Sequence, residues 1–397
     1  MRRLAIPLLL AMLAAGCDGL PSGEQPRISG EQRAQEEPVT ARSSPEAPEA
    51  RRTDAAKGAG RDKVPGRTYV AWTPGGLPPG TIPALAEIPG VTGAAEVTAG
   101  LIWMTDATSG ASPAEGYEIP IEVAFVERRA HRQMFPGAPR YLHFSPGNLL
   151  FSGTGFALRG VARGNYALDS DRGSFTGRCC TSDRAAMGYE AIGAGAPPND
   201  WGVSYALVRA TRALSARDVR RAVGQGPWRV RSRDDTPYLR YADAVVPQMR
   251  LKEHFGEFSA RPSDDGTLTI EPTWLERNIV QRKVPILGKV ECHRSLFEQL
   301  QLTLGTLDQR GLAAAVKPSE YAGCFNARFI GSDPGGRLSS HAWGAALDAA
   351  SASNPFGAPP AMDPRVVRAF ERSGFNWGGR WLVPDGMHFE WARSLGA

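Results

Sequence analysis

Several features that often decide a protein's class are scarce in this chain of 397 residues. Lysine and arginine outnumber aspartate and glutamate by only 46 to 41, and a net charge of +5 is too small to favour nucleic-acid binding. After the N-terminal segment, no stretch reaches the ~18 apolar residues that a membrane-spanning helix needs. Glycine (45) and proline (32) are frequent but follow no Gly-X-Y period, which excludes collagen. The remaining composition, 42% hydrophobic and 22% charged, is that of a globular protein of about two or three domains.

The first 16 residues combine a positive start, an apolar run and a small-residue end. Two arginines precede the apolar residues 4–15, a pattern typical of an export signal that is too short to span a membrane stably. The Ala-Ala-Gly directly before Cys17 resembles bacterial lipoprotein signals, in which this cysteine is lipidated and becomes the mature N-terminus. We therefore expect residues 1–16 to be a signal peptide, and a lipid on Cys17 to anchor an exported protein to a membrane of the cell envelope. The alternative is an ordinary secretory signal that happens to precede a cysteine.

Residues 17–66 contain no tryptophan, tyrosine or phenylalanine and are rich in glutamate, arginine, alanine, serine and proline. Such a segment cannot bury enough apolar surface to offset the entropy lost on ordering. It is therefore predicted to be a disordered tether between the lipid and the folded part.

Five cysteines are present, and four remain if Cys17 carries lipid. An exported protein meets an oxidising compartment, where cysteines can pair. We favour a bridge between Cys292 and Cys324. The adjacent Cys179 and Cys180 could pair with each other only through a strained vicinal bond, and the sequence leaves their state open.

Residues 67–248 are predicted to form an α+β domain to which the sequence assigns no role. Strands are expected at 69–72 and 97–104, and alternating apolar residues at 119–125 predict a half-buried strand that Pro120 places at an edge. Residues 205–214 are predicted to be helical, and Ser215 is expected to cap a second helix that runs to Val223. His131 is interpreted as a structural or surface residue because no partner motif accompanies it.

Residues 249–397 are predicted to form a second domain. A hairpin is expected from residues 252–260 and 267–270, around a turn at 264–266. Apolar residues at helical spacing between Leu296 and Leu307 predict a core helix that Gly311 ends. A further helix is expected to begin at Asp363-Pro364.

Two short motifs near the C-terminus carry the residue types of a metal site. The first runs from Ser339 to Asp348 and contains His341, and the second contains Asp385 and His388. Two neutral imidazoles and one carboxylate can give Zn²⁺ three protein ligands and leave a fourth position for water. A glycine at 344 lets the chain turn, so that His341 and Asp348 can face one ion despite their odd separation. Asp385 lies in a loop beside the second histidine and can act as a base.

The pattern Ser-x-His-x-x-Gly-x-Ala-x-Asp followed by Asp-x-x-His resembles the zinc peptidases of bacterial peptidoglycan. These include the D-alanyl-D-alanine carboxypeptidases, the D-Ala-D-Ala dipeptidases and the L-alanyl-D-glutamate endopeptidases. The aspartate of the second motif is closer to the endopeptidase-like branch. The resemblance covers roughly residues 267–397. It implies a C-terminal zinc-peptidase domain with a small antiparallel sheet and packed helices, preceded by the separate α+β domain, so the overall fold class is α+β.

The resemblance also implies roles for individual residues. Zn²⁺ would be bound by His341, Asp348 and His388, with Asp385 as the general base. Arg328 matches an arginine that steadies the substrate carbonyl as its oxygen becomes anionic, and Ser339 matches a serine that helps to hold the substrate. Trp377 and Trp381 are expected to wall the cleft. Glu390 competes with Asp385 for the role of base, although a role in orienting a metal ligand is favoured for it.

These inferences predict a zinc metallopeptidase that hydrolyses peptide bonds in peptidoglycan stem peptides with a water activated by the metal. The bond would be that of a D,D-carboxypeptidase or of an L-Ala-D-Glu-type endopeptidase. The alternatives are a non-catalytic peptidoglycan-binding lipoprotein and a zinc peptidase that acts on a protein or small peptide. Nucleic acid is not an expected partner.

Overall fold

The computed structural model describes residues 66–135, 147–161, 165–195, 197, 201–232, 234–236, 238–243 and 246–395. The predicted signal peptide, Cys17 and all but the last residue of the predicted tether lie outside these ranges. Residues 63–397 form one compact unit. Within its described part, no helix is long and apolar enough to cross a membrane.

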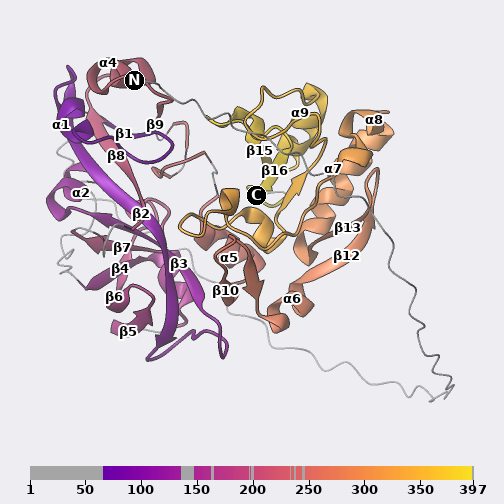
Figure 1. Ribbon diagram of the computed structural model, residues 1–397, viewed down its shortest axis with the longest axis horizontal. Coiled ribbons are helices and arrows are strands. Elements are labelled where there is room, and N and C mark those ends of the chain that lie inside the picture. Colours follow the sequence, from indigo (N-terminus) through magenta and orange to yellow (C-terminus); the bar gives the residue numbers. More distant parts are fainter. Residues whose placement is uncertain are drawn as a thin grey trace, which may run out of the picture. The chain divides into compact units, whose positions relative to one another are not determined.

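The elements fall into a strand-rich first part and a mixed second part (Figure 1). The first part contains β1 (Arg67–Trp72), α1 (Thr81–Ala86), β2 (Val91–Ala107), β3 (Ile119–Val126), α2 (Arg128–Met134), β4 (Asn148–Ser152), α3 (Gly153–Leu158), β5 (Asn165–Ser170), β6 (Gly173–Thr181), β7 (Ala191–Ala194), β8 (Val203–Ala210), α4 (Ala216–Val223) and β9 (Arg229–Ser232). The second part contains α5 (Gln248–Phe255), β10 (Ala260–Pro262), β11 (Leu268–Ile270), α6 (Pro272–Asn278), β12 (Ile279–Val284), β13 (Gly288–His293), α7 (Phe297–Gln309), α8 (Ala313–Val316), β14 (Ala346–Asp348), α9 (Pro364–Arg372), β15 (Phe375–Trp377) and β16 (His388–Trp391).

The strands of the first part form a 9-stranded sheet in the order β3-β7-β4-β6-β5-β2-β8-β1-β9, and β2 also pairs with β3. That extra pairing closes β3, β7, β4, β6, β5 and β2 into a ring, because the first strand of the series meets the sixth. The 17 residues of β2 make this possible: residues 91–99 pair with β8, 97–104 with β3 and 104–107 with β5. Figure 1 shows β2 as the long strand beside β3 and β8. Closure removes exposed edges from this part of the sheet.

The structure confirms the strands at 69–72 and 97–104 and the helix that Ser215 caps, and it corrects two other expectations. Residues 203–210, predicted to be largely helical, form β8 between β1 and β2. Six consecutive β8 residues, 205–210, are buried, so the strand lacks the alternation that would distinguish it from a helix. Residues 119–126 form β3, but every one of them is buried, so the strand is covered on both faces and is not half-buried.

Pro120 lies in the part of β3 that pairs only with β2, because β7 pairs with residues 123–126. The edge that proline predicts is therefore present locally. The Pro120 carbonyl accepts hydrogen bonds from the side chains of Gln248 and Lys252. Of the two positions expected for His131, structural or surface, the structure shows the structural one: His131 is buried, and its Nε2 lies 2.8 Å from the Ala185 carbonyl.

The predicted hairpin at 252–270 is only partly correct. Residues 248–255 form helix α5, and only residues 260–262 and 268–270 pair as β10 and β11. Five residues of α5 are buried, and two of the five are polar: Gln248 and Lys252 are buried together with Met249, Leu251 and Phe255. These two polar residues made the helix difficult to predict from the sequence, because lysine and glutamine are expected on the solvent face of an amphipathic helix.

The predicted core helix and the helix at Asp363-Pro364 are confirmed as α7 and α9. Gly311 adopts a positive φ of 68° after α7, a conformation open to glycine. A 3-stranded antiparallel sheet, in the order β14-β16-β15, completes the second part. The predicted Cys292–Cys324 disulfide is present, and the structure also joins Cys179 to Cys180.

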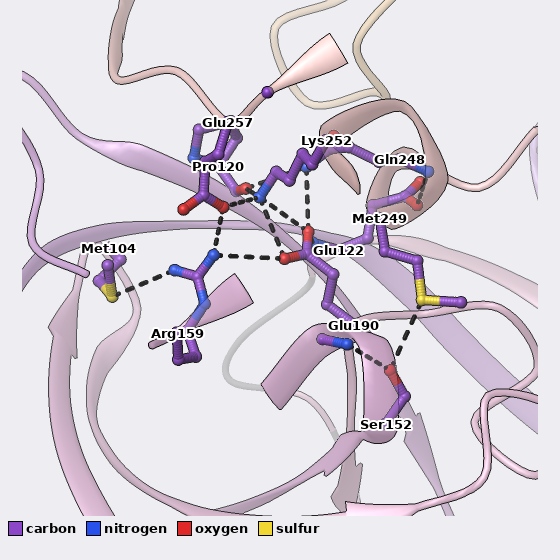
Figure 2. A network of polar contacts seen from close by, with 12 residues as sticks. Met104, Pro120, Glu122, Ser152, Arg159, Glu190, Gln248, Met249, Lys252 and Glu257 are labelled. Atoms are coloured by element: carbon purple, nitrogen blue, oxygen red, sulfur yellow. Dashed lines mark hydrogen bonds and ion pairs between the residues drawn. The ribbon is translucent and has the colours of Figure 1, made fainter. Parts of the chain in front are cut away.

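The boundary between two domains at residues 248 and 249 stays a prediction. Contacts between side chains cross this boundary. Leu101 and Trp103 of β2 belong to the same hydrophobic core as α7, α9 and β16. Lys252 of α5 forms ion pairs with Glu190 and Glu257, and Arg159 bonds with Glu257 (Figure 2). Buried side chains therefore tie α5 to the strand-rich part.

Candidate metal centre

Two strands and one tight turn bring the three predicted ligands together. His341 lies in a 3₁₀ helix, Ser340–Trp343, which Gly344 ends with a positive φ of 60°. The chain then enters β14, whose last residue, Asp348, is paired across the ladder with His388 of β16. The turn at Gly344 lets His341 approach the same point. A side chain there would collide with the backbone, because an added Cβ would come within 2.5 Å of the His293 nitrogen.

The donor atoms of the three residues form a small triangle. His341 Nε2 lies 3.1 Å from His388 Nδ1 and 3.2 Å from Asp348 Oδ1. His388 Nδ1 lies 3.1 Å from the same carboxylate oxygen. All three residues are buried, and within the described part of the chain they are the group of this kind whose ligand atoms lie close enough to hold one metal ion.

The opposite ring nitrogens of the two histidines have their own partners. His341 Nδ1 lies 2.7 Å from the Cys324 carbonyl, which can only accept a hydrogen bond, so this nitrogen is the donor. The Cys292–Cys324 disulfide anchors that carbonyl to β13. His388 Nε2 lies 3.7 Å from Glu390 Oε2 and 3.5 Å from Ser340 Oγ. Such partners fix the orientation of metal-binding imidazoles.

The site favours positive charge. Burial raises the pKa of Asp348, but hydrogen bonding to His341 and His388 outweighs the effect of burial. The pKa of this carboxyl group therefore lies far below its usual range. Burial lowers the pKa of His388, yet the neighbouring carboxylates of Asp348 and Glu390 raise it to about 10. The carboxylates thus stabilise a cation between these side chains.

Asp385 and Glu390, the two candidate bases, occupy different positions. Asp385 Oδ1 is buried and has no hydrogen-bond partner among the described residues. Burial is the largest influence on Asp385 and raises its pKa, which suits a group that accepts a proton. Glu390 lies beside His388 Nε2, on the side of the ring away from the donor triangle. This arrangement favours Asp385 as the base and Glu390 as the group that orients His388.

A cavity of about 310 Å³ opens onto Asp348 and His388. Among the described residues, Arg328, Ser339, Trp381 and Asp385 line it, and Trp377 does not. The Trp377 indole instead donates a hydrogen bond to the Gly386 carbonyl at 2.9 Å and so supports the loop that carries Asp385. Trp381 packs beside His388, with ring centroids 5.2 Å apart.

Ser339 and Arg328 are held by the backbone near the ligands. Ser339 Oγ accepts a hydrogen bond from the His341 amide at 3.3 Å, and its own amide donates to the Arg328 carbonyl at 3.1 Å. The Arg328 guanidinium has one hydrogen bond among the described residues, to the Phe329 carbonyl at 3.3 Å. Most of its donors are therefore available to a ligand in the cavity.

Sequence reasoning missed a large part of the cavity wall. Arg337, Met387, Glu122, Val246, Gln248 and Leu251 also line the cavity. Met387, which directly precedes His388, lines the cavity with it. Of the last four residues, Glu122 belongs to β3, Val246 lies just before α5, and Gln248 and Leu251 belong to α5. No motif links them to the metal-site pattern, so nothing in the sequence could have placed them here.

Comparison with known proteins supports a class for this site. Residues 333–391, which contain all three donor residues and Asp385, match the family model described as D-alanyl-D-alanine carboxypeptidase. The match supports a peptidase domain of that family in the C-terminal part of the chain. No curated protein sequence matches the chain significantly. A solved domain of a protein described as a permease, from Porphyromonas gingivalis, aligns with 47% of this chain and 94% of its own length, at 16% identity and a TM-score of 0.29.

Proposed function

We propose that this protein is a zinc metallopeptidase that hydrolyses peptide bonds in peptidoglycan stem peptides. The observation that carries the proposal is the convergence of His341, Asp348 and His388 beside Asp385, within the segment that matches the carboxypeptidase family. The scissile bond would be that of a D,D-carboxypeptidase or of an L-Ala-D-Glu-type endopeptidase.

The donor set fits Zn²⁺. One imidazole offers Nε2, the other offers Nδ1, and a carboxylate oxygen completes a set of three that is typical of catalytic zinc sites. Asp385 Oδ1, which is buried and has no hydrogen-bond partner among the described residues, is a further polar atom that a hydrated cation could satisfy. When bound, Zn²⁺ would supply a Lewis acid that polarises a carbonyl and lowers the pKa of water.

The chain's own side chains divide the remaining work. Asp385 takes the proton of the water that attacks the peptide carbonyl and returns it to the leaving amine. Arg328 donates hydrogen bonds to the carbonyl oxygen as negative charge develops on it. Ser339 already accepts a hydrogen bond from the His341 amide, so its hydroxyl hydrogen is left to donate to the peptide. Glu390 holds the His388 ring in place.

We further propose that the enzyme is exported and anchored through a lipid on Cys17 to the extracytoplasmic face of a membrane. The N-terminal pattern of residues 1–16 supports this location, and residues 17–66 would serve as the tether between the lipid and the peptidase. Peptidoglycan is the polymer that such an enzyme would meet.

The decisive experiment measures zinc content and hydrolysis on the same preparation. Purified peptidoglycan and muropeptides are incubated with the metal-loaded protein and with a chelator-treated sample, and released amino acids and peptides are identified by mass spectrometry. We expect cleavage that is lost with the metal and restored by Zn²⁺. Binding of peptidoglycan without release of any product would instead support the non-catalytic wall-binding lipoprotein. Cleavage of unrelated peptides but not of muropeptides would indicate a peptidase with another substrate.

A further inference from the structure

Arg337 is a cation in the cavity for which the proposed chemistry has no use. The residue is only 8% exposed, and it lines the cavity together with Asp348 and His388. No hydrogen bond or ion pair joins its guanidinium to any described residue. Its contact is with the Tyr241 ring, whose centroid lies 5.1 Å from the Arg337 Cζ. Charged side chains are rarely this deeply buried unless they are paired, so an unpaired guanidinium in a cavity indicates an anionic ligand.

The backbone places Arg328 and Arg337 on either side of one bridged pair of residues. Phe329 and Leu338 form an antiparallel bridge, and the Ile330 amide donates to the Arg337 carbonyl at 2.8 Å. The segment between the two arginines is therefore a folded loop that returns to its starting point. Both arginines line the cavity, at positions that flank the bridged pair.

Glu122, an acidic residue of the cavity lining, is paired with groups other than Arg337. Glu122 has one oxygen on Arg240 and the other on the Gln248 amide, 3.0 Å away. Burial raises the pKa of Glu122, but the charges of Arg240 and Arg337 bring it below its usual value. Arg240 is thus the direct ion-pair partner of Glu122, and the donors of Arg337 remain available.

The cavity has a closed end and an open end. Glu122, Gln248 and Leu251 form a wall whose members are 3–4% exposed. The lining residues Ile330 and Phe356 are 38% and 62% exposed, which places them at the mouth.

The closed wall is also held rigidly. Gln248 Nε2 donates to the Pro120 carbonyl at 2.9 Å, and the neighbouring Lys252 pairs with Glu190 at 2.9 Å (Figure 2). These contacts fasten α5 to β3 and to the chain just before β7. The wall is therefore a fixed boundary of the cavity, and a chain that continued past it would have to break this network.

We propose that Arg337 and this wall form a subsite for the terminal carboxylate of the substrate peptide, which makes the enzyme a carboxypeptidase. This assignment rests on the proposed function and goes further, because a fixed wall admits a chain end but not a continuing chain. A cavity of about 310 Å³ is at the lower limit of ordinary ligand pockets and suits one or two small residues beyond the scissile bond. The guanidinium can engage the carboxylate with two parallel hydrogen bonds.

Stem peptides carry another carboxylate, on the D-glutamate residue, and the experiment separates the two sources. Three acylated peptides that end in D-Ala-D-Ala are compared: the free acid, its C-terminal amide, and the free acid with D-isoglutamine in place of D-glutamate. We expect the zinc-loaded protein to prefer the free acid over the C-terminal amide by about 10- to 100-fold in kcat/KM. This ratio corresponds to the free energy of one charge-assisted hydrogen bond. The isoglutamine peptide should behave as the free acid does.

Variants assign this preference to Arg337. Arg337→Met keeps an apolar side chain against Tyr241 but removes the charge, so the ratio between acid and C-terminal amide should fall towards one. With Arg337→Ala, millimolar guanidinium ion should restore part of the activity on the free acid. Arg282→Met is the matched control, because Arg282 also lies over an aromatic ring, that of Phe297, and is exposed outside the cavity. It should retain the wild-type ratio.

Binding separates the failure of this subsite from the failure of the proposed function. Calorimetry with zinc-loaded Asp385→Asn protein measures the affinity for the same three peptides without turnover. Preference for the free acid in binding supports the subsite even if the wild type cleaves nothing, in which case the proposed function alone fails. Equal affinity for acid and C-terminal amide, or a preference that Arg337→Met leaves intact, overturns the subsite. Discrimination against the isoglutamine peptide alone would assign Arg337 to the D-glutamate carboxylate and overturn the terminal assignment.

Discussion

Replacing Lys252 with methionine should destabilise the protein strongly, although Lys252 lies outside the donor triangle. The side chains of Lys252 and Glu190 are both 0% exposed. The Lys252 Nζ lies 2.9 Å from Glu190 and 2.8 Å from Glu257, and it also donates to the Pro120 carbonyl. Methionine fills a similar volume, so the change removes a charge and its hydrogen bonds with little loss of packing.

The expected magnitude follows from the charges that remain. Without Lys252, the buried Glu190 and the half-buried Glu257 share Arg159, which lies 3.8 Å from Glu190 and bonds directly to Glu257. Removing one partner of a buried pair costs about 3–5 kcal/mol, because the remaining charge is left in a medium of low polarity. Burial already raises the pKa of Glu190, so protonation of that residue can relieve the excess charge at low pH. The loss of stability should therefore be larger at pH 8 than at pH 5.

Denaturant unfolding at the two pH values, followed by circular dichroism, measures the effect. Lys289→Met is the control, because Lys289 is an exposed lysine on β13 and its replacement should change the free energy of unfolding by less than ~0.5 kcal/mol. Adding Glu190→Gln to Lys252→Met should recover part of the lost stability by removing the unpaired charge. If Lys252→Met unfolds at the wild-type denaturant concentration, the network does not fasten α5, and the rigid wall of the cavity has no support.

Four further outcomes follow from the same structure. His388→Ala should lose bound zinc and hydrolysis together while circular dichroism stays native, and zinc retained at full stoichiometry would contradict its place in the donor set. Asp385→Asn should keep zinc in metal analysis but lower kcat by ~10²–10⁴-fold, and a wild-type rate would exclude it as the base. Replacing Cys292 and Cys324 together with serine should lower the free energy of unfolding by ~3–4 kcal/mol, because their bridge spans 32 positions; no change under non-reducing conditions would contradict this. Burial lowers the pKa of His293 to about 4 from 6.5, so the unfolded state binds the proton first, and stability should fall by up to about 3 kcal/mol as the pH drops from 6.5 to 4; a His293→Gln protein should show a shallower slope.

Local chemistry let the sequence predict several elements of this fold. The helices α7 and α9 carry their own apolar spacing and end signals, and the Ser215 cap needs only neighbours in the chain. The ligand motifs are also short-range patterns: Gly344 supplies the turn between His341 and Asp348, which brings these residues to one point with His388. Such features survive in a sequence because the residues that cause them lie within a few positions of one another.

Tertiary structure decided what depends on distant partners. Residues 203–210 form a strand because β1 and β2 pair with them on either side. Helix α5 can bury a lysine because Glu190 and Glu257 form ion pairs with it. The position of Arg337 in a cavity with a closed wall likewise depends on β3 and α5, far from it in the chain. The motif therefore identified the residues that could hold a metal, whereas the wall that sets how much peptide fits beside them arises only when separate segments pack together. Burial and ion pairing depend on which segments meet, and that information is spread over the whole chain.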